Sequence, residues 1–106
     1  MAGKRVVAES DLKQIQTFIE FGSGESGQVP TKEQITAALQ MEAPKIYKQI
    51  QDGAIVLTGT RSRQNIWAYT PDPQSIANYH LILTSNGVER IDPGPLKKRL
   101  EQEKGT

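Results

Sequence analysis

The most informative pattern in the chain is that of residues 31–70, TKEQITAALQMEAPKIYKQIQDGAIVLTGTRSRQNIWAYT. Its first half has the spacing of two short amphipathic helices joined by a turn. Its second half places β-branched and aromatic runs on either side of a polar, basic segment. We therefore expect a helix pair followed by a two-stranded hairpin whose tip carries Arg61 and Arg63.

The first helix of this pair has a complete start signal. The Thr31 hydroxyl is placed to accept a hydrogen bond from the Gln34 amide, and the Gln34 side chain is placed to reach back, which is a capping box. Its buried face is predicted to contain Ile35, Ala38 and Leu39. These residues recur at helical spacing and would pack against the rest of the domain.

The second helix of the pair is expected to follow a turn formed by residues 40–42. Pro44 suits the first turn of a helix, where its missing N–H removes no hydrogen bond. Ile46 and Ile50 are four residues apart and would share the inward face. Asp52-Gly53 should end the helix, because glycine readily takes the left-handed conformation found there.

Two pairs of short apolar runs predict two hairpins. The strands expected are residues 54–58, 66–70, 79–84 and 88–91. The first pair encloses the polar loop of residues 59–64, and the second encloses Asn86-Gly87, a strong hairpin signal. The segment PDPQS, residues 71–75, should break regular structure at its two prolines.

Helices are also predicted near both ends of the chain. The first should begin at a cap residue, Ser10 or Asp11, and end near Gly22, where glycine and serine become frequent. Its apolar face contains Leu12, Ile15, Phe18 and Ile19. The last helix is expected over residues 96–103, where two leucines lie four residues apart.

The composition indicates one α+β domain spanning residues 1–106, with a flexible N-terminal arm at 1–9 and a tail at 104–106. Without cysteine, disulfides and thiolate metal sites are excluded, and His80, the single histidine, excludes a multi-histidine zinc site. We interpret His80 as structural and expect neither a metal nor a cofactor. The N-terminus lacks the long apolar segment of a secretory signal, so we expect a cytoplasmic protein.

Residues 31–70 resemble a winged helix-turn-helix domain, the fold of many bacterial, archaeal and phage regulators. Ile35 and Leu39 match the buried positions of the supporting helix, and Met41 matches the apolar position of the turn. Residues 54–70 would form the wing. The sequence departs from the family pattern at Gln40, where a small residue is common, and at Gln49, where an aliphatic residue is common.

The resemblance implies that the second helix of the pair lies in the major groove of duplex DNA. The local charge agrees, because residues 43–70 contain four basic side chains and one acidic side chain, a local charge of +3 in a chain of net charge +1. The candidate DNA-binding residues are Lys45, Tyr47, Lys48, Gln49, Gln51, Arg61, Ser62, Arg63 and Gln64. Tyr47 faces either DNA or the edge of the core, and Trp67 should pack beneath the helix or at a dimer contact.

We expect a homodimeric transcriptional regulator or DNA-organising protein, associated with the nucleoid, in a prokaryotic or viral setting. Pairing through the first and last helices would use Phe18, Ile19, Leu96 and Leu100. The alternative is a winged-helix module that binds another protein and not DNA, which the near-neutral net charge favours. An enzyme is not expected, because no catalytic triad signature, HExxH motif or carboxylate cluster is present.

Overall fold

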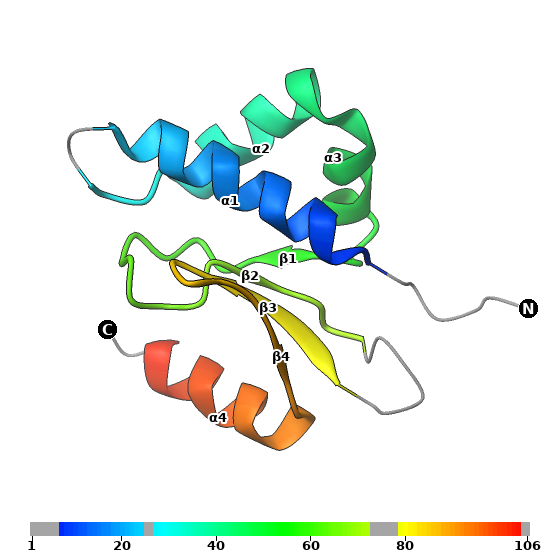
Figure 1. Ribbon diagram of the computed structural model, residues 1–106, viewed down its shortest axis with the longest axis vertical. Coiled ribbons are helices and arrows are strands. Elements are labelled where there is room, and N and C mark those ends of the chain that lie inside the picture. Colours follow the sequence, from blue (N-terminus) through cyan, green and yellow to red (C-terminus); the bar gives the residue numbers. More distant parts are fainter. Residues whose placement is uncertain (1–6, 25–26, 73–78, 105–106) are drawn as a thin grey trace, which may run out of the picture.

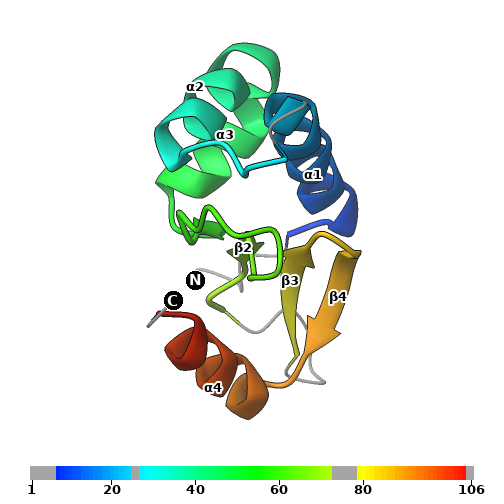
Figure 2. The same cartoon turned by 90° about the vertical axis from the view of Figure 1, so that its left-hand side faces the viewer.

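The computed structural model describes residues 7–24, 27–72 and 79–104, and they form an α+β fold. The elements are α1 (Glu9–Ser23), α2 (Lys32–Glu42), α3 (Pro44–Gln51), β1 (Val56–Leu57), β2 (Ala68–Tyr69), β3 (His80–Thr84), β4 (Gly87–Ile91) and α4 (Pro93–Lys104). The strands form one antiparallel sheet in chain order, β1-β2-β3-β4. Helices α1, α2 and α3 cover one face of the sheet and α4 covers the other (Figures 1 and 2).

The sheet separates two hydrophobic cores. The larger core lies between the sheet and the three N-terminal helices and includes Leu12, Leu39 and Trp67. The smaller core lies beneath the sheet, where Ile66, Ile82 and Leu96 pack together. The sheet therefore buries apolar side chains on both faces, and each face has its own helical cover.

The local signals for α2 and α3 are confirmed. Thr31 and Gln34 form the expected capping box, with the Gln34 amide 3.1 Å from the Thr31 hydroxyl and the Thr31 amide 2.9 Å from the Gln34 side-chain oxygen. Pro44 stands in the first turn of α3, and Gly53 has a positive φ of 83° just after the helix. Each of these residues affects only the backbone next to it, so the sequence alone is enough to predict where the helix begins or ends.

The expected turn at residues 40–42 is wrong, because those residues belong to α2 and only Ala43 separates the two helices. Gln40, Met41 and Glu42 are all good helix formers, and the break falls at the residue that precedes proline, where the helical conformation is disfavoured. Met41 consequently fills no apolar position in a turn. Its side chain is 83% exposed.

The first hairpin is present, but its strands are shorter than expected. The amides of Ala54 and Ile55 bond to the Gln49 carbonyl at the end of α3, which removes them from the sheet. Val56 pairs with Tyr69, and Leu57 pairs with Ala68. The backbone beside β2 still bonds to β3, since the Trp67 amide is 2.8 Å from the Leu83 carbonyl.

The second hairpin is confirmed with a small change in register. Thr84 pairs with Gly87, so the two turn residues are Ser85 and Asn86, and Gly87 opens β4 with a φ of 111°. The segment of residues 71–75 lies mostly outside the described residues. The last helix begins three residues earlier than expected, at Pro93, because prolines fit the first turn of a helix.

Three expectations about the ends of the chain are corrected. Helix α1 begins at Glu9 after Ala8, which makes no side-chain cap, so neither Ser10 nor Asp11 is the cap. Val7 is buried and α1 includes Glu9, so the described part of the expected flexible arm is tied to the core. Residues 1–6 and 105–106 lie outside the described residues, and Lys104 still belongs to α4.

Two of the four residues expected to form a pairing surface on α1 and α4 are interior, while Phe18 and Leu100 are half-buried. Ile19 and Leu96 are buried within their own chain, in separate cores. The two helices lie on opposite faces of the sheet (Figure 1). They therefore cannot present one continuous surface to a second copy.

Leu39 and Met41 provide a matched test of this core. Leu39 is 0% exposed, whereas Met41, two residues along the same helix, is 83% exposed. Leu39→Ala should lower the free energy of unfolding by about 2–5 kcal/mol because it leaves a cavity. Met41→Ala should change it by less than about 0.5 kcal/mol. Urea denaturation followed by circular dichroism measures both, and equal losses would contradict the assigned faces of α2.

Candidate nucleic-acid interface

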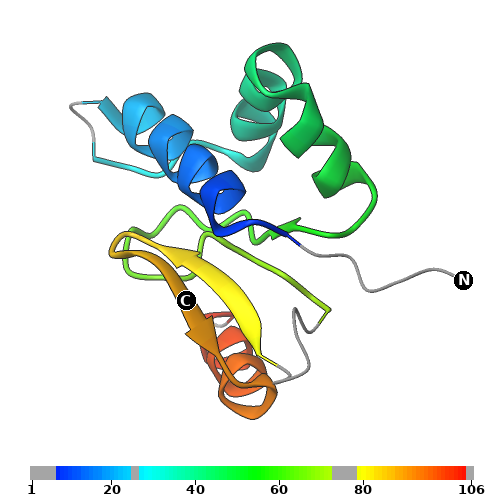
Figure 3. The ribbon, with the colours of Figure 1, turned by 45° about the vertical axis from the view of Figure 1, so that its right-hand side comes forward.

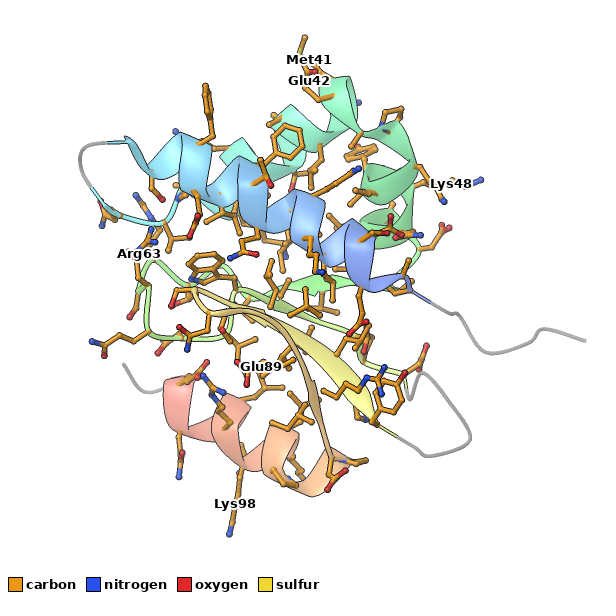
Figure 4. The ribbon with its side chains drawn as sticks, viewed as in Figure 1. Met41, Glu42, Lys48, Arg63, Glu89 and Lys98 are labelled. Carbon is orange, nitrogen blue, oxygen red and sulfur yellow. The ribbon has the colours of Figure 1, made fainter. Side chains whose placement is uncertain are left out.

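Helix α3 has one face against the domain and one in solvent. Ile46 is buried, while Gln49 and Ile50 are half-buried on the same side. Lys45 and Lys48 are exposed, and Figure 4 shows the Lys48 side chain pointing away from the domain. Because Pro44 starts the helix and the Ile46–Ile50 spacing fixes its inward face, the sequence itself turns the two lysines outward.

Neither lysine of α3 has a carboxylate partner in the described part of the chain. The ion pairs found there join Arg63 to Glu20, Arg90 to Glu9 and Arg99 to Glu103. The two ammonium groups of α3 thus remain available to an external anion. An unpaired lysine pair on an exposed helix suits phosphate contacts, which set the register of a protein on duplex nucleic acid.

Gln49 does not join this exposed face. Its side-chain nitrogen lies 3.2 Å from the Asp11 carboxylate and links α3 to the first turns of α1. Its side-chain oxygen is buried and has no hydrogen-bond partner among the described residues. Gln49 thus occupies a position between α3 and α1.

Tyr47 and Gln51 form a pair at the edge of the exposed face. Tyr47 is half-buried and packs against the larger core. Its hydroxyl accepts a hydrogen bond of 2.9 Å from the Gln51 side chain, which is itself exposed. The ring therefore covers the edge of the core, and the polar end of the pair points outward.

The loop of residues 59–64 between β1 and β2, expected to be the wing tip, is held against the helical layer. Arg61 donates through Nε to the Val29 carbonyl, just before α2. The Arg63 guanidinium lies 3.3 Å from the Glu20 carboxylate and 3.5 Å from the Ser23 hydroxyl, and its carbon lies 5.6 Å from the centroid of the Trp67 ring. Both arginines thus make contacts within their own chain.

The remaining polar residues of this loop organise its backbone. The Gln64 amide donates to the Ser62 hydroxyl at 3.3 Å, and the Ser62 amide donates to the Thr60 hydroxyl at 3.2 Å. Thr60 also accepts from the Asn65 side chain at 3.1 Å. Ser62 and Gln64 are exposed, so these two predicted residues remain on the surface.

The predicted interface is divided in space. Lys48 and Arg63 lie at opposite ends of the helical layer in the view of Figure 4. Helix α3 and the wing tip therefore do not form one compact basic patch. The sequence showed that both segments are basic, but it did not show that they are separated. The separation depends on how the hairpin of β1 and β2 runs beneath the helices.

Trp67 and His80 are both interior residues. Trp67 is 2% exposed and belongs to the larger core, so it packs within its own chain and not at a dimer contact. His80 is buried, and its Nδ1 lies 2.7 Å from the Thr70 carbonyl. This contact supports the structural interpretation of His80.

Within the described ranges, no group of three or more histidine, cysteine, aspartate or glutamate side chains is placed to hold a metal ion. The same ranges contain no helix with the length and apolar character needed to cross a membrane. Comparison of the chain with protein-family models, curated proteins and solved structures found no match.

The Arg63 contacts give a testable expectation. Arg63→Ala removes a partly exposed ion pair and a contact with the face of Trp67, each worth up to about 1 kcal/mol at such sites. We expect a loss of about 1 kcal/mol of unfolding free energy and a shift in the emission of Trp67, the single tryptophan. Gln64→Ala is the control, since its side chain is exposed in the same loop. Unchanged stability and emission in Arg63→Ala would show that these contacts do not hold the loop.

Proposed function

We propose that the chain binds duplex DNA as a winged helix-turn-helix protein, with α3 in the major groove and the loop between β1 and β2 as its wing. The observation that carries the proposal is the pair Lys45 and Lys48, exposed on α3 without a carboxylate partner in the described part of the chain. The order of elements supports it, because two closely spaced helices are followed directly by an antiparallel hairpin.

The dimensions of α3 suit a groove. With its side chains an α-helix is about 10–12 Å across, close to the roughly 12 Å width of the major groove of B-DNA. Lys45 and Lys48 would neutralise phosphates, and Gln51, supported by Tyr47, would reach base edges. Glutamine can bond to adenine through both of its amide atoms.

In this proposal the wing contacts DNA through residues other than Arg61 and Arg63, the two arginines expected to do so from the sequence. Arg61 and Arg63 are positioning residues in this proposal, because they fasten the loop to the start of α2 and the end of α1. The exposed Ser62 and Gln64 would then meet the sugar-phosphate backbone. A regulator of transcription or a DNA-organising protein is the role that this binding would serve.

One observation favours the alternative, a module that binds protein and not DNA. Phe21 is 89% exposed at the end of α1. Exposed aromatic side chains are enriched at protein interfaces. The two functions differ in a simple measurement, because only DNA binding by lysines weakens steeply as salt rises.

Charge removal on α3 tests the main proposal. Lys45→Ala with Lys48→Ala should weaken binding to a duplex of random sequence and reduce the log–log salt slope by about two units. Lys97→Ala with Lys98→Ala is the matched control, because it removes the same charge from exposed positions of α4, on the far side of the sheet (Figure 4). Fluorescence anisotropy measures both. Equal slopes for the two double variants, or no binding by the parent chain at low salt, would overturn the proposal.

Base readout is tested by two glutamines on the same helix. Gln51→Ala should change the sequence selected from a random pool, because its side chain is exposed beside Tyr47. Gln49→Ala should leave the selected sequence unchanged, because its side chain points toward Asp11. If Gln49→Ala changed the selected sequence and Gln51→Ala did not, the assignment of base contact to the exposed face of α3 would be wrong. Thermal melting of both variants checks that they are folded.

A further inference from the structure

A cavity of about 500 Å³ lies between the hairpin of β1 and β2 and the last turns of α4. It forms at the edge of the sheet, because β1 is the outermost strand and the smaller core under α4 includes no described residue of that strand. Its volume falls within the range of about 300–1,000 Å³ that is typical of sites for small molecules. We call it the α4 cavity.

The two walls of the α4 cavity are joined by hydrogen bonds. Glu103, near the end of α4, accepts from the Ile66 amide at 2.8 Å and from the Arg99 Nε at 3.0 Å. On the hairpin, the Thr58 hydroxyl donates to the Ile66 carbonyl at 2.6 Å. Ile66 therefore connects the hairpin to α4, so the fold itself sets the shape of the cavity, as in most small-molecule sites.

The lining of the α4 cavity has an apolar part and an acidic part. The apolar part includes Val56, Ile66, Tyr69 and Leu100. Glu101 and Glu103 supply two carboxylates, and no lysine, arginine or histidine is among the described residues of the lining. A molecule with an apolar body and a cationic end would match both parts, whereas an anion would meet like charge.

The basic residues of α4 do not cancel this acidic character. Arg99 pairs with Glu103, which leaves two carboxylates against one guanidinium and a net charge of −1. Glu101 is exposed and makes no ion pair within the described part of the chain. Lys97 and Lys98 do not line the cavity, and the Lys98 side chain points away from the sheet (Figure 4).

We propose that the α4 cavity binds a small organic cation, a primary ammonium group carried on an apolar or aromatic body. The ammonium group donates to the carboxylates of Glu101 and Glu103, because charge-assisted hydrogen bonds of this kind are the strong ones. The body packs against Val56 and Leu100. Tyr69 adds an aromatic ring, which attracts a cation to its face as well as packing against apolar groups.

This site is separate from the proposed DNA-binding face. Helices α3 and α4 lie on opposite sides of the sheet in two views (Figures 1 and 3), so a ligand in the α4 cavity leaves the exposed face of α3 open. Binding of the cation is measured without DNA. Its outcome is therefore independent of the DNA-binding proposal.

Three probes that share one phenyl ring and one ethyl chain test the selection for positive charge. They are phenethylammonium, the neutral phenethyl alcohol and the anion hydrocinnamate, each titrated into the isotope-labelled full chain and followed by the amide signals in NMR spectra. Phenethylammonium should shift the amides of Thr58, Gly59 and Ile66, which line the cavity. Its dissociation constant should be about tenfold lower than that of the alcohol, and hydrocinnamate should bind most weakly. Equal affinities for the three probes, or shifts confined to residues outside the lining, would overturn the proposal.

Two variants of the lining test the site itself. Val56→Phe fills the cavity from a half-buried position on β1, where an aromatic residue suits a strand, and should raise the dissociation constant of phenethylammonium at least tenfold. Glu101→Gln removes one carboxylate from an exposed position and should raise it about threefold.

Glu33→Gln is the matched control for charge. It removes one carboxylate from an exposed position of α2, on the other side of the sheet, and should leave the constant unchanged. Circular dichroism verifies that each variant is folded, and the comparison of Glu101→Gln with Glu33→Gln decides the matter if Val56→Phe does not fold. Equal effects of the two glutamate variants, or parent-like binding by folded Val56→Phe, would show that the cation does not bind in the α4 cavity.

Discussion

Burial of β3 on both faces is the constraint on which the rest of the structure depends. All five side chains of the strand are buried, with Leu81 and Leu83 in the core under α1–α3 and Ile82 in the core above α4. Antiparallel sheets commonly leave one face in water, but both faces of this strand are buried, and its two polar side chains, His80 and Thr84, are buried with the rest. The chain must therefore supply helices on both sides. Thr70 satisfies the polar groups at one end of β3, since its hydroxyl accepts from the Leu81 amide at 2.9 Å and its carbonyl contacts His80.

The features that were predicted correctly from the sequence are those in which a residue determines the conformation of the backbone within a few residues of itself. The capping box at Thr31, Pro44 at the start of α3 and the hairpin of β3 and β4 belong to this class. All three are present, although the hairpin turns at Ser85 and Asn86 and not at Asn86 and Gly87. The end of α2 was predictable from the same proline, because the helical conformation is disfavoured for the residue that precedes a proline. The turn expected at residues 40–42 did not take this rule into account, and α2 continues to Glu42.

The features missed from the sequence depend on partners far along the chain. Gln49 bonds to Asp11, 38 residues away, and Arg63 pairs with Glu20, 43 residues away. Residue type and spacing identified both as polar groups suited to DNA. The residues next to Gln49 and Arg63 in the sequence do not indicate the carboxylate that the fold places beside each of them. Only the tertiary packing therefore shows which polar side chains remain free to contact DNA.

The same distinction explains how a chain of net charge +1 can have an exposed basic face on α3. Arg63, Arg90 and Arg99 are each matched by a glutamate in the fold, whereas Lys45 and Lys48 have no such partner among the described residues. Arginine suits such fixed pairs because its planar fork loses little freedom on binding, whereas a hydrated lysine remains mobile. Net charge counts both kinds of cation equally, but an approaching phosphate meets chiefly the unpaired ones. The field outside the protein is therefore set less by the total charge than by the cations that folding leaves unpaired, and in this chain two of them share the outer face of α3.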